Sequence, residues 1–186
     1  KNIFLTGNTI VDALEIFKTQ KKIKKIKKEQ GFIFVTCHRR ENYANYEKLI
    51  ENISNTVKIF KTLEIRFLTH PGVLRFKNIK KKLLNLNKNS NVRIYYQLSY
   101  FQCLSFISNS KFIISDSGGI QEEAPSFKKF VFVIRNYTER IESIENKVSK
   151  LIKFENNEIF QNIKKNYTSK NLYKKKIMIG DYFSTH

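Results

Sequence analysis

Short apolar runs alternate with longer stretches of helical periodicity along most of the sequence. The short runs predict buried strands, and apolar residues three and four positions apart predict helices. We expect strands at 3–5, 32–36, 65–68, 92–95, 111–115, 130–134 and 148–152. We expect helices at about 10–18, 46–61, 75–84 and 99–109, and another that begins near residue 120. Strands and helices that alternate in this way are typical of a doubly wound, mainly parallel sheet, so we predict a Rossmann-like α/β fold.

The length of the chain favours a single domain. Its 186 residues are enough for one well-buried domain and few for two, and no internal repeat or Pro/Gly/Ser-rich linker interrupts the alternation. We expect residues 1–186 to form one domain, with a polar connection or exposed helical turn at 21–28 and a loosely attached, lysine-rich tail at 164–186. The first residue is a lysine that leads directly into a predicted strand, so we expect the chain to be a piece of something longer.

The net charge of +19 raises the question of a nucleic-acid or membrane partner. Most lysines lie in runs, and the sequence is also rich in asparagine and isoleucine. An AT-rich coding sequence produces this bias on solvated faces, so we do not expect a nucleic-acid partner. No apolar run reaches the roughly 18–20 residues of a membrane span, and Cys37 and Cys103 form no metal-binding pattern. We therefore expect a cytoplasmic protein with no membrane partner.

Residues 111–126, KFIISDSGGIQEEAPS, combine a buried strand, a glycine-containing turn and the start of a helix. This order places backbone N–H groups at a helix N-terminus, where the helix dipole favours an anion. Gly118 and Gly119 let a large anion approach the backbone without a Cβ in the way, and Ser117 can cap the helix or donate to a phosphate. The acidic pair one turn later suits the hydroxyls of a ribose. A capped helix with no ligand remains the alternative, because short glycine motifs are common.

Polar residues follow several of the predicted strands at their carboxyl ends. They are TGNT (6–9), HRREN (38–42), THPG (69–72), SDSGG (115–119) and RNYTER (135–140). Because ligands of doubly wound sheets bind beyond the carboxyl ends of the strands, we expect these loops to gather at one edge and form a binding site. For single residues the alternatives stay open: Arg39 or Arg40 as a solvated loop arginine, and residues 6–9 as a helix cap.

These segments resemble motifs of the non-hydrolysing UDP-N-acetylglucosamine 2-epimerases. The matching segments are TGNTIVDAL (6–14), TCHRRENY (36–43), THP (69–71), DSGGIQEEAPS (116–126) and RNYTERIE (135–142), in the family's order and at compatible spacing. The resemblance covers about residues 3–152. It implies the C-terminal half of a glycosyltransferase-B (GT-B) architecture, in which the active site lies between two Rossmann-like halves.

The resemblance implies an isomerase that interconverts UDP-N-acetylglucosamine and UDP-N-acetylmannosamine. Such enzymes eliminate UDP and add it back to a glycal intermediate, and they need no redox or metal cofactor. The C-terminal half is expected to bind UDP, while the acidic residues that exchange the proton at C2 are expected in an N-terminal half that this sequence does not match. The implied partners are the UDP-sugar substrate, that N-terminal half and, when both halves are present, a second copy in a homodimer.

The resemblance also implies the residues that bind UDP. Ser117, Gly118 and Gly119 match positions that hold the phosphates. Glu123 matches the carboxylate that binds the ribose, whereas Glu122 beside it is expected at the surface. Arg140 of the TER segment matches an arginine whose guanidinium suits a diphosphate.

The implied catalytic residue is a histidine. His38 matches a residue next to the diphosphate that can stabilise or protonate the leaving UDP. Arg39 and His70 match positions linked to ligand contacts and to substrate activation in some members. Cys37, between the strand and His38, is expected only to fill space.

The sequence departs from the family pattern at several positions. Ile141 replaces the proline of TERPE, 128–130 (KKF) replaces Gly-Lys-Pro, 72–73 (GV) replaces Asn-Pro, Gln97 replaces a proline, and Cys103 replaces an aromatic residue near the base. These changes bear on uracil packing more than on phosphate binding. Two alternatives to the epimerase remain: an inactive UDP-sugar-binding remnant, and half of a GT-B glycosyltransferase. TCHRREN and DSGGIQEEAPS argue against the second, because both segments are specific to the epimerases.

Overall fold

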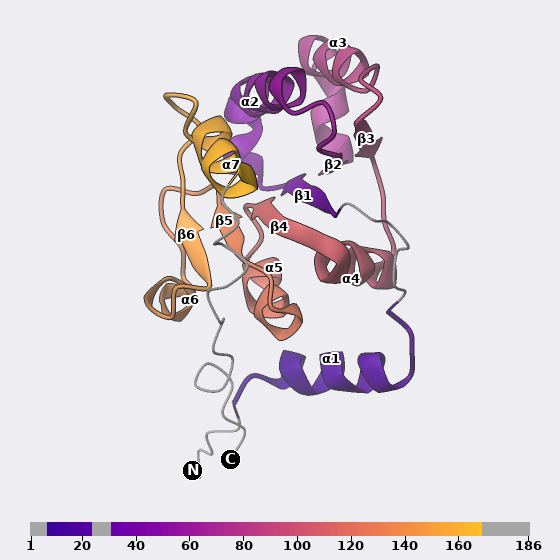
Figure 1. Cartoon of the computed structure of the whole chain (residues 1–186), viewed down its shortest axis with the longest axis vertical. Coiled ribbons are helices and arrows are strands. Elements are labelled where there is room, and N and C mark those ends of the chain that lie inside the picture. The colour runs from indigo at the N-terminus through magenta and orange to yellow at the C-terminus, as the bar shows by residue number, and fades with distance from the viewer. Residues whose placement is uncertain (1–6, 24–30, 169–186) are drawn as a thin grey trace.

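The computed structural model describes residues 7–23 and 31–168, and Figure 1 shows a central sheet with helices on both faces. Its six strands follow the order β3-β2-β1-β4-β5-β6, and every neighbouring pair is parallel. The strands are β1 (Phe32–Cys37), β2 (Ile65–Thr69), β3 (Val92–Tyr95), β4 (Ser110–Ser115), β5 (Val131–Val133) and β6 (Ser149–Leu151). With β1 and β4 at the centre, successive strands add outward on both sides, which confirms the predicted Rossmann-like doubly wound sheet.

Helices cover the two faces of this sheet. The α-helices are α1 (Thr9–Thr19), α2 (Tyr46–Ile59), α3 (Lys77–Leu86), α4 (Tyr100–Asn109), α5 (Gly118–Glu123), α6 (Ile141–Glu145) and α7 (Glu158–Thr168), and the 3-10 helices are η1 (Arg40–Asn45), η2 (Pro71–Arg75) and η3 (Ala124–Phe127). Helices α2, α3 and α7 lie on one face, and α1, α4 and α5 lie on the other (Figure 1). Within the described ranges, no helix has the length and apolar character that crossing a bilayer requires.

Alternate residues of the central strands face two separate apolar cores. In β1, Ile33 and Val35 pack in the core that includes α2, α3 and α7, while Phe32 and Phe34 pack in the core that includes α4 and α5. Every residue of β1 is buried, because helices cover the strand on both faces. The near-continuous apolar run therefore ends where the chain leaves the sheet after Cys37, and the polar residues that follow lie at the carboxyl edge.

The predicted strands and helices that fall within the described residues are present, with ends shifted by up to two positions. The expectation of a loose tail is wrong for residues 164–168, which belong to α7. Helix α7 packs on α2 through the buried Ile159 and Ile163, and the N–H of Phe160 donates to Asn52 Oδ1 at 3.1 Å. Residues 169–186 lie outside the described residues, as do the predicted strand at 3–5 and most of the lysine run at 21–28.

Candidate functional site

The loops after β1, β2, β4 and β5 lie at the carboxyl edge of the sheet, as predicted. The two central strands pair directly, with Thr36 opposite Ser115. The residues that follow these two strands, His38 after β1 and Asp116 and Ser117 after β4, therefore lie at neighbouring strand ends. In the sequence, 78 positions separate His38 from Asp116. The predicted phosphate turn and the predicted catalytic histidine therefore share one edge.

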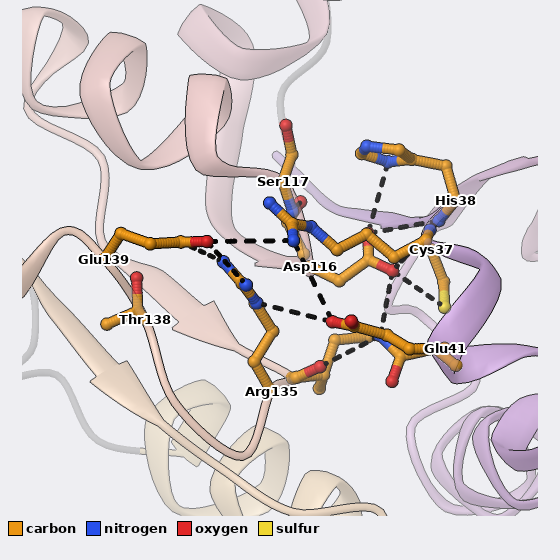
Figure 2. Close-up of polar contacts among 12 residues, drawn as sticks. Cys37, His38, Glu41, Asp116, Ser117, Arg135, Thr138 and Glu139 are labelled. Atoms are coloured by element: carbon orange, nitrogen blue, oxygen red, sulfur yellow. Dashed lines mark hydrogen bonds and ion pairs between the residues drawn. The ribbon is translucent and has the colours of Figure 1, made fainter.

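Asp116, directly after β4, joins the β4 loop to the β1 loop (Figure 2). Its side chain is fully buried. Oδ2 accepts hydrogen bonds from the N–H of Arg39 at 2.9 Å, the amide of Asn42 at 2.9 Å and the thiol of Cys37 at 3.4 Å. Both carboxylate oxygens lie 3.1 Å from the backbone nitrogen of His38, and Oδ1 lies 3.2 Å from its ring Nδ1. One carboxylate thus fixes the start of the loop that carries the predicted catalytic residue.

The side chains of His38 and Ser117 also lie beside this carboxylate (Figure 2). The His38 side chain is 43% exposed, and Figure 2 shows its ring and the Ser117 hydroxyl extending to the same side of Asp116. Ser117 caps α5, because its Oγ accepts the N–H of Ile120 at 3.4 Å. The N–H of Ser117 in turn donates to Ser115 Oγ at 2.9 Å, which fixes the turn between strand and helix.

Gly118 and Gly119, in the first turn of α5, have room for a Cβ. A Cβ built on Gly118 would lie 3.9 Å from Arg39 Nη2, and one on Gly119 would lie 3.8 Å from Ser117 Oγ. Both distances are ordinary van der Waals contacts, and neither glycine adopts a positive φ. The described part of the chain therefore gives no packing or backbone reason for glycine at these positions, which is the arrangement expected where a ligand approaches the backbone.

Glu123 is a buried carboxylate at the other end of α5. It is 8% exposed, and its Oε1 accepts a hydrogen bond from the hydroxyl of Tyr100 on α4 at 2.9 Å. Burial raises the pKa of Glu123, and the charge of Glu122 adds to the rise while the Tyr100 bond opposes it. Burial and the Glu123 charge also raise the pKa of the Cys103 thiol to about 12. The predicted ribose contact is thus a carboxylate held beside α4.

A bidentate ion pair between Arg135 and Glu139 holds the start of the loop after β5. The buried guanidinium of Arg135 donates to the Glu139 carboxylate at 2.6 and 3.1 Å (Figure 2). These bonds lower the pKa of Glu139 to about 2. Glu139 Oε1 also lies 3.9 Å from Nη1 of Arg39, so this ion pair connects the β5 loop with the β1 loop.

Arg140 is tied to α5 in two ways. Its N–H donates to Thr138 Oγ1 at 3.1 Å, and the Thr138 hydroxyl donates to Gln121 Oε1 at 2.8 Å. Its side chain forms an ion pair with Glu122 through Nε. Arg140 therefore lies beside the helix that begins at the Ser117 turn, and Glu122, expected to be a plain surface carboxylate, is its ion-pair partner.

His70 follows β2 and is held by different contacts. Its Nδ1 accepts the N–H of Gly72 at 3.0 Å and lies 2.8 Å from the hydroxyl of Tyr43. Because a backbone N–H can only donate, Nδ1 is the unprotonated nitrogen, and in the neutral ring Nε2 carries the hydrogen. His70 is at the predicted edge, but these contacts join it to η1 and not to Asp116.

Three departures from the family motifs have visible local effects. Lys128 has a φ of 57°, in the left-handed region, at the position where the resemblance predicts glycine. A Cβ on Gly72 would lie 2.9 Å from both His70 Nδ1 and the Tyr43 hydroxyl, so only glycine fits beside this pair. Ile141, at the family's proline position, is the first residue of α6 and is 58% exposed.

The structure brings most predicted residues together and adds others. His38, Arg39 and the turn at 117–119 are in one cluster, and Arg140 is attached to the same helix. The sequence prediction gave no role to Asn42, Tyr100, Asp116, Gln121 and Thr138. Asp116 and Asn42 belong to the matched segments, and a carboxylate directly after β4 and an amide in the loop after β1 were an available signal. Tyr100 lies outside those segments and needed the tertiary structure.

Comparisons with known proteins agree with the family resemblance. The family model described as UDP-N-acetylglucosamine 2-epimerase matches residues 1–184. A UDP-N-acetylglucosamine 2-epimerase of Salmonella borreze is 35% identical over 201 residues, covering 98% of this chain and 51% of the relative. The crystal structure of UDP-GlcNAc 2-epimerase from Neisseria meningitidis bound to UDP-GlcNAc aligns with a TM-score of 0.78 and 30% identity, over 92% of this chain and 48% of that one.

The chain spans about half the length of the curated relatives it matches. The C-terminal domain of a glycosyl transferase group 1 family protein from Francisella tularensis, at 15% identity, shares the fold alone, with a TM-score of 0.63 over 88% of this chain and 86% of that domain. The six-stranded parallel sheet is thus the fold of one half of GT-B-like structures. Four of the matched segments lie at the carboxyl ends of β1, β2, β4 and β5, and the family model covers nearly the whole chain, which therefore belongs to the UDP-N-acetylglucosamine 2-epimerase family.

Proposed function

We propose that this chain is the UDP-binding half of an enzyme that interconverts UDP-N-acetylglucosamine and UDP-N-acetylmannosamine. The observation that carries the proposal is the turn at Gly118 and Gly119, where a Cβ on Gly118 would lie 3.9 Å from Arg39 Nη2, next to Ser117, whose hydroxyl extends to the same side of Asp116 as the His38 ring (Figure 2). The Neisseria meningitidis structure bound to UDP-GlcNAc, which aligns over 92% of this chain, supports the choice of ligand. The whole reaction is assigned to an assembly that contains a second half of the same architecture.

In this proposal the turn holds the diphosphate. The N–H groups of Gly118 and Gly119 and the hydroxyl of Ser117 donate to phosphate oxygens, and the absence of Cβ atoms allows a close approach. Arg140, already beside α5, provides a guanidinium that can pair with a phosphate in exchange for Glu122. Glu123 accepts hydrogen bonds from the ribose hydroxyls at the far end of the same helix.

His38 acts on the leaving group. As UDP departs, charge develops on its phosphate oxygen, and a histidine next to the diphosphate can stabilise that charge or donate a proton. Arg39 and His70 contribute further ligand contacts from the β1 and β2 loops. Removal of the proton at C2 needs a base on the opposite side of the sugar, and we assign that base to the N-terminal half of the complete enzyme.

Calorimetry with UDP and uridine tests the binding role. We expect UDP to bind the chain and uridine to bind more weakly, because uridine lacks the diphosphate. Arg140→Ala should weaken UDP binding by about 1.5–3 kcal/mol, the usual value of a hydrogen bond to a charged group. Lys58→Ala, at the end of α2, removes the same charge elsewhere and should leave the affinity unchanged. Equal affinities for UDP and uridine would contradict the phosphate assignment.

Exchange of solvent deuterium at C2 of the sugar tests whether the base lies in the N-terminal half and not in this chain. The 186-residue chain alone should incorporate no deuterium into UDP-N-acetylglucosamine. Addition of a separately produced N-terminal half should restore exchange, and His38→Ala in this chain should abolish it again. Exchange catalysed by the isolated chain would place the base in this half. UDP binding without restored exchange would favour an inactive remnant, and sugar transfer to an acceptor would favour the glycosyltransferase alternative.

A further inference from the structure

The contacts of Asp116 assign different roles to its two carboxylate oxygens. Oδ2 accepts from the N–H of Arg39, the amide of Asn42 and the thiol of Cys37, all groups that act here as donors. Oδ1 faces the Nδ1 atom of the His38 ring at 3.2 Å. A hydrogen on Nδ1 is attracted to this carboxylate, whereas a lone pair there would be repelled by it, so we expect Nδ1 to carry the hydrogen.

We propose that Asp116 is a positioning residue, which holds His38 with a hydrogen on Nδ1, so that Nε2 is the ring nitrogen that takes up a proton from solvent and, in the imidazolium form, presents it to a bound ligand. Asp116 does not touch the ligand in this proposal and acts only through His38. Its backbone contacts with His38 and Arg39 fix the loop, while Oδ1 fixes the ring. The inference rests on the proposed function only for the identity of the ligand.

His70 has the opposite arrangement, because a donor and not an acceptor faces its Nδ1. Its Nδ1 accepts from the N–H of Gly72, so its hydrogen lies on Nε2. The two histidines of this sheet edge are therefore expected in opposite tautomers, each set by the group that faces Nδ1. This difference depends on the group that faces each Nδ1 and is present without any ligand.

Asp116→Asn should reverse the tautomer of His38 while it keeps the loop contacts made at Oδ2, including the one to the N–H of His38. The side-chain oxygen of asparagine should take the Oδ2 position, because Arg39 and Asn42 both donate there. The new NH₂ group then occupies the Oδ1 position and donates to Nδ1 of His38. The ring must accept that hydrogen bond, so its own hydrogen moves to Nε2.

The test is NMR of the ring nitrogens in ¹⁵N-labelled chain, at a pH where the rings are neutral. A protonated and an unprotonated ring nitrogen have well-separated ¹⁵N shifts, so the tautomer is read directly. His38→Gln identifies the His38 signals by their loss. We expect His38 as the Nδ1–H form, His70 as the Nε2–H form, and an exchange of the two His38 shifts in Asp116→Asn.

Glu139→Gln is the matched control, because it removes a neighbouring carboxylate that pairs with Arg135 and not with His38. It should leave the His38 tautomer unchanged. An Nε2–H tautomer of His38 in the wild-type chain, or the same reversal in Glu139→Gln, would overturn the proposal. If Asp116→Asn does not fold, the wild-type tautomer alone decides.

UDP titration of the same samples separates this inference from the proposed function. Failure of the wild-type chain to bind UDP would contradict the proposed function and leave the tautomer result standing. If UDP binds, the proposal predicts that the His38 Nε2 signal shifts in the wild-type chain and that the Nδ1 signal shifts much less. A larger shift at Nδ1 than at Nε2 would also overturn it.

Discussion

Asp116 and Glu123 are both buried carboxylates, and they flank the same short helix, yet their surroundings differ. Asp116 is fully buried and is surrounded by donors from the β1 loop, including two backbone N–H groups. Glu123 is 8% exposed, accepts one hydrogen bond from Tyr100, and has its pKa raised by burial. Donors of the chain itself satisfy the carboxylate of Asp116. The carboxylate of Glu123 accepts one hydrogen bond, and burial disfavours its charged form.

This difference separates two classes of site residue. A buried charge that its own chain satisfies contributes to stability and to the position of its neighbours. A buried charge that is poorly satisfied lowers stability and is retained where a ligand completes its hydrogen bonds. The glycines follow the same division, since a Cβ on Gly72 would clash with its neighbours, while a Cβ on Gly119 would fit.

Loss of the Asp116 side chain is expected to have the largest effect. Asp116→Ala removes the acceptor from several buried donors, and we expect the free energy of unfolding to fall by about 3–5 kcal/mol. Urea denaturation measures this change. Glu139→Ala, which removes a half-exposed carboxylate from the neighbouring loop, should have a much smaller effect. If both variants lost a similar free energy of unfolding, Asp116 would be no more important for stability than an exposed carboxylate.

The glycine comparison should give changes of opposite sign. In Gly72→Ala the new Cβ meets His70 and Tyr43 at 2.9 Å, and we expect a loss of about 1–2 kcal/mol. In Gly119→Ala the new Cβ meets nothing closer than 3.8 Å, and alanine in a helix should stabilise the free chain by about 0.5–1 kcal/mol. Thermal or urea unfolding gives both values. UDP affinity should fall in Gly119→Ala, and unchanged affinity would show that the open space is not used by the diphosphate.

Glu123→Gln should have the smallest effect on stability, and the effect should depend on pH. The folded-state pKa of Glu123 is raised above the unfolded value, so the wild-type chain loses stability as pH rises between these two values. The glutamine variant lacks this loss and should be slightly more stable than the wild-type chain at neutral pH, with no advantage in acid. Unfolding measured across pH tests this. UDP binding should weaken by about 1 kcal/mol, because a neutral acceptor replaces a charged one.

The fold was largely accessible from the sequence because β1 and β4 are buried on both faces and read as clear apolar runs. Helix α7 was missed, since lysines and asparagines interrupt the pattern around Ile159 and Ile163. Its stability comes from packing on α2, which a local pattern does not contain. The 3-10 helices η1 and η2 are too short to show any periodicity.

The site was predicted as a set of strand-end loops, and that prediction needed only the parallel order of the strands. The links between the loops were not predictable in the same way. The contacts of Asp116 with His38 and Arg39 join segments 78 and 77 positions apart, and Tyr100 reaches Glu123 from a separate helix. Such contacts depend on side-chain geometry at the strand ends, which periodicity and motif spacing do not specify.

The position of Asp116 also has a consequence for hydrogen exchange. The amide hydrogens of His38 and Arg39 lie in a loop, yet both bond to the side chain of the residue directly after the neighbouring central strand and not to a backbone carbonyl. They can exchange with solvent only when the ends of β1 and β4 separate or the carboxylate turns away. Slow exchange at these two amides, measured residue by residue, therefore reports how often the centre of the sheet opens at the edge where the ligand is proposed to bind.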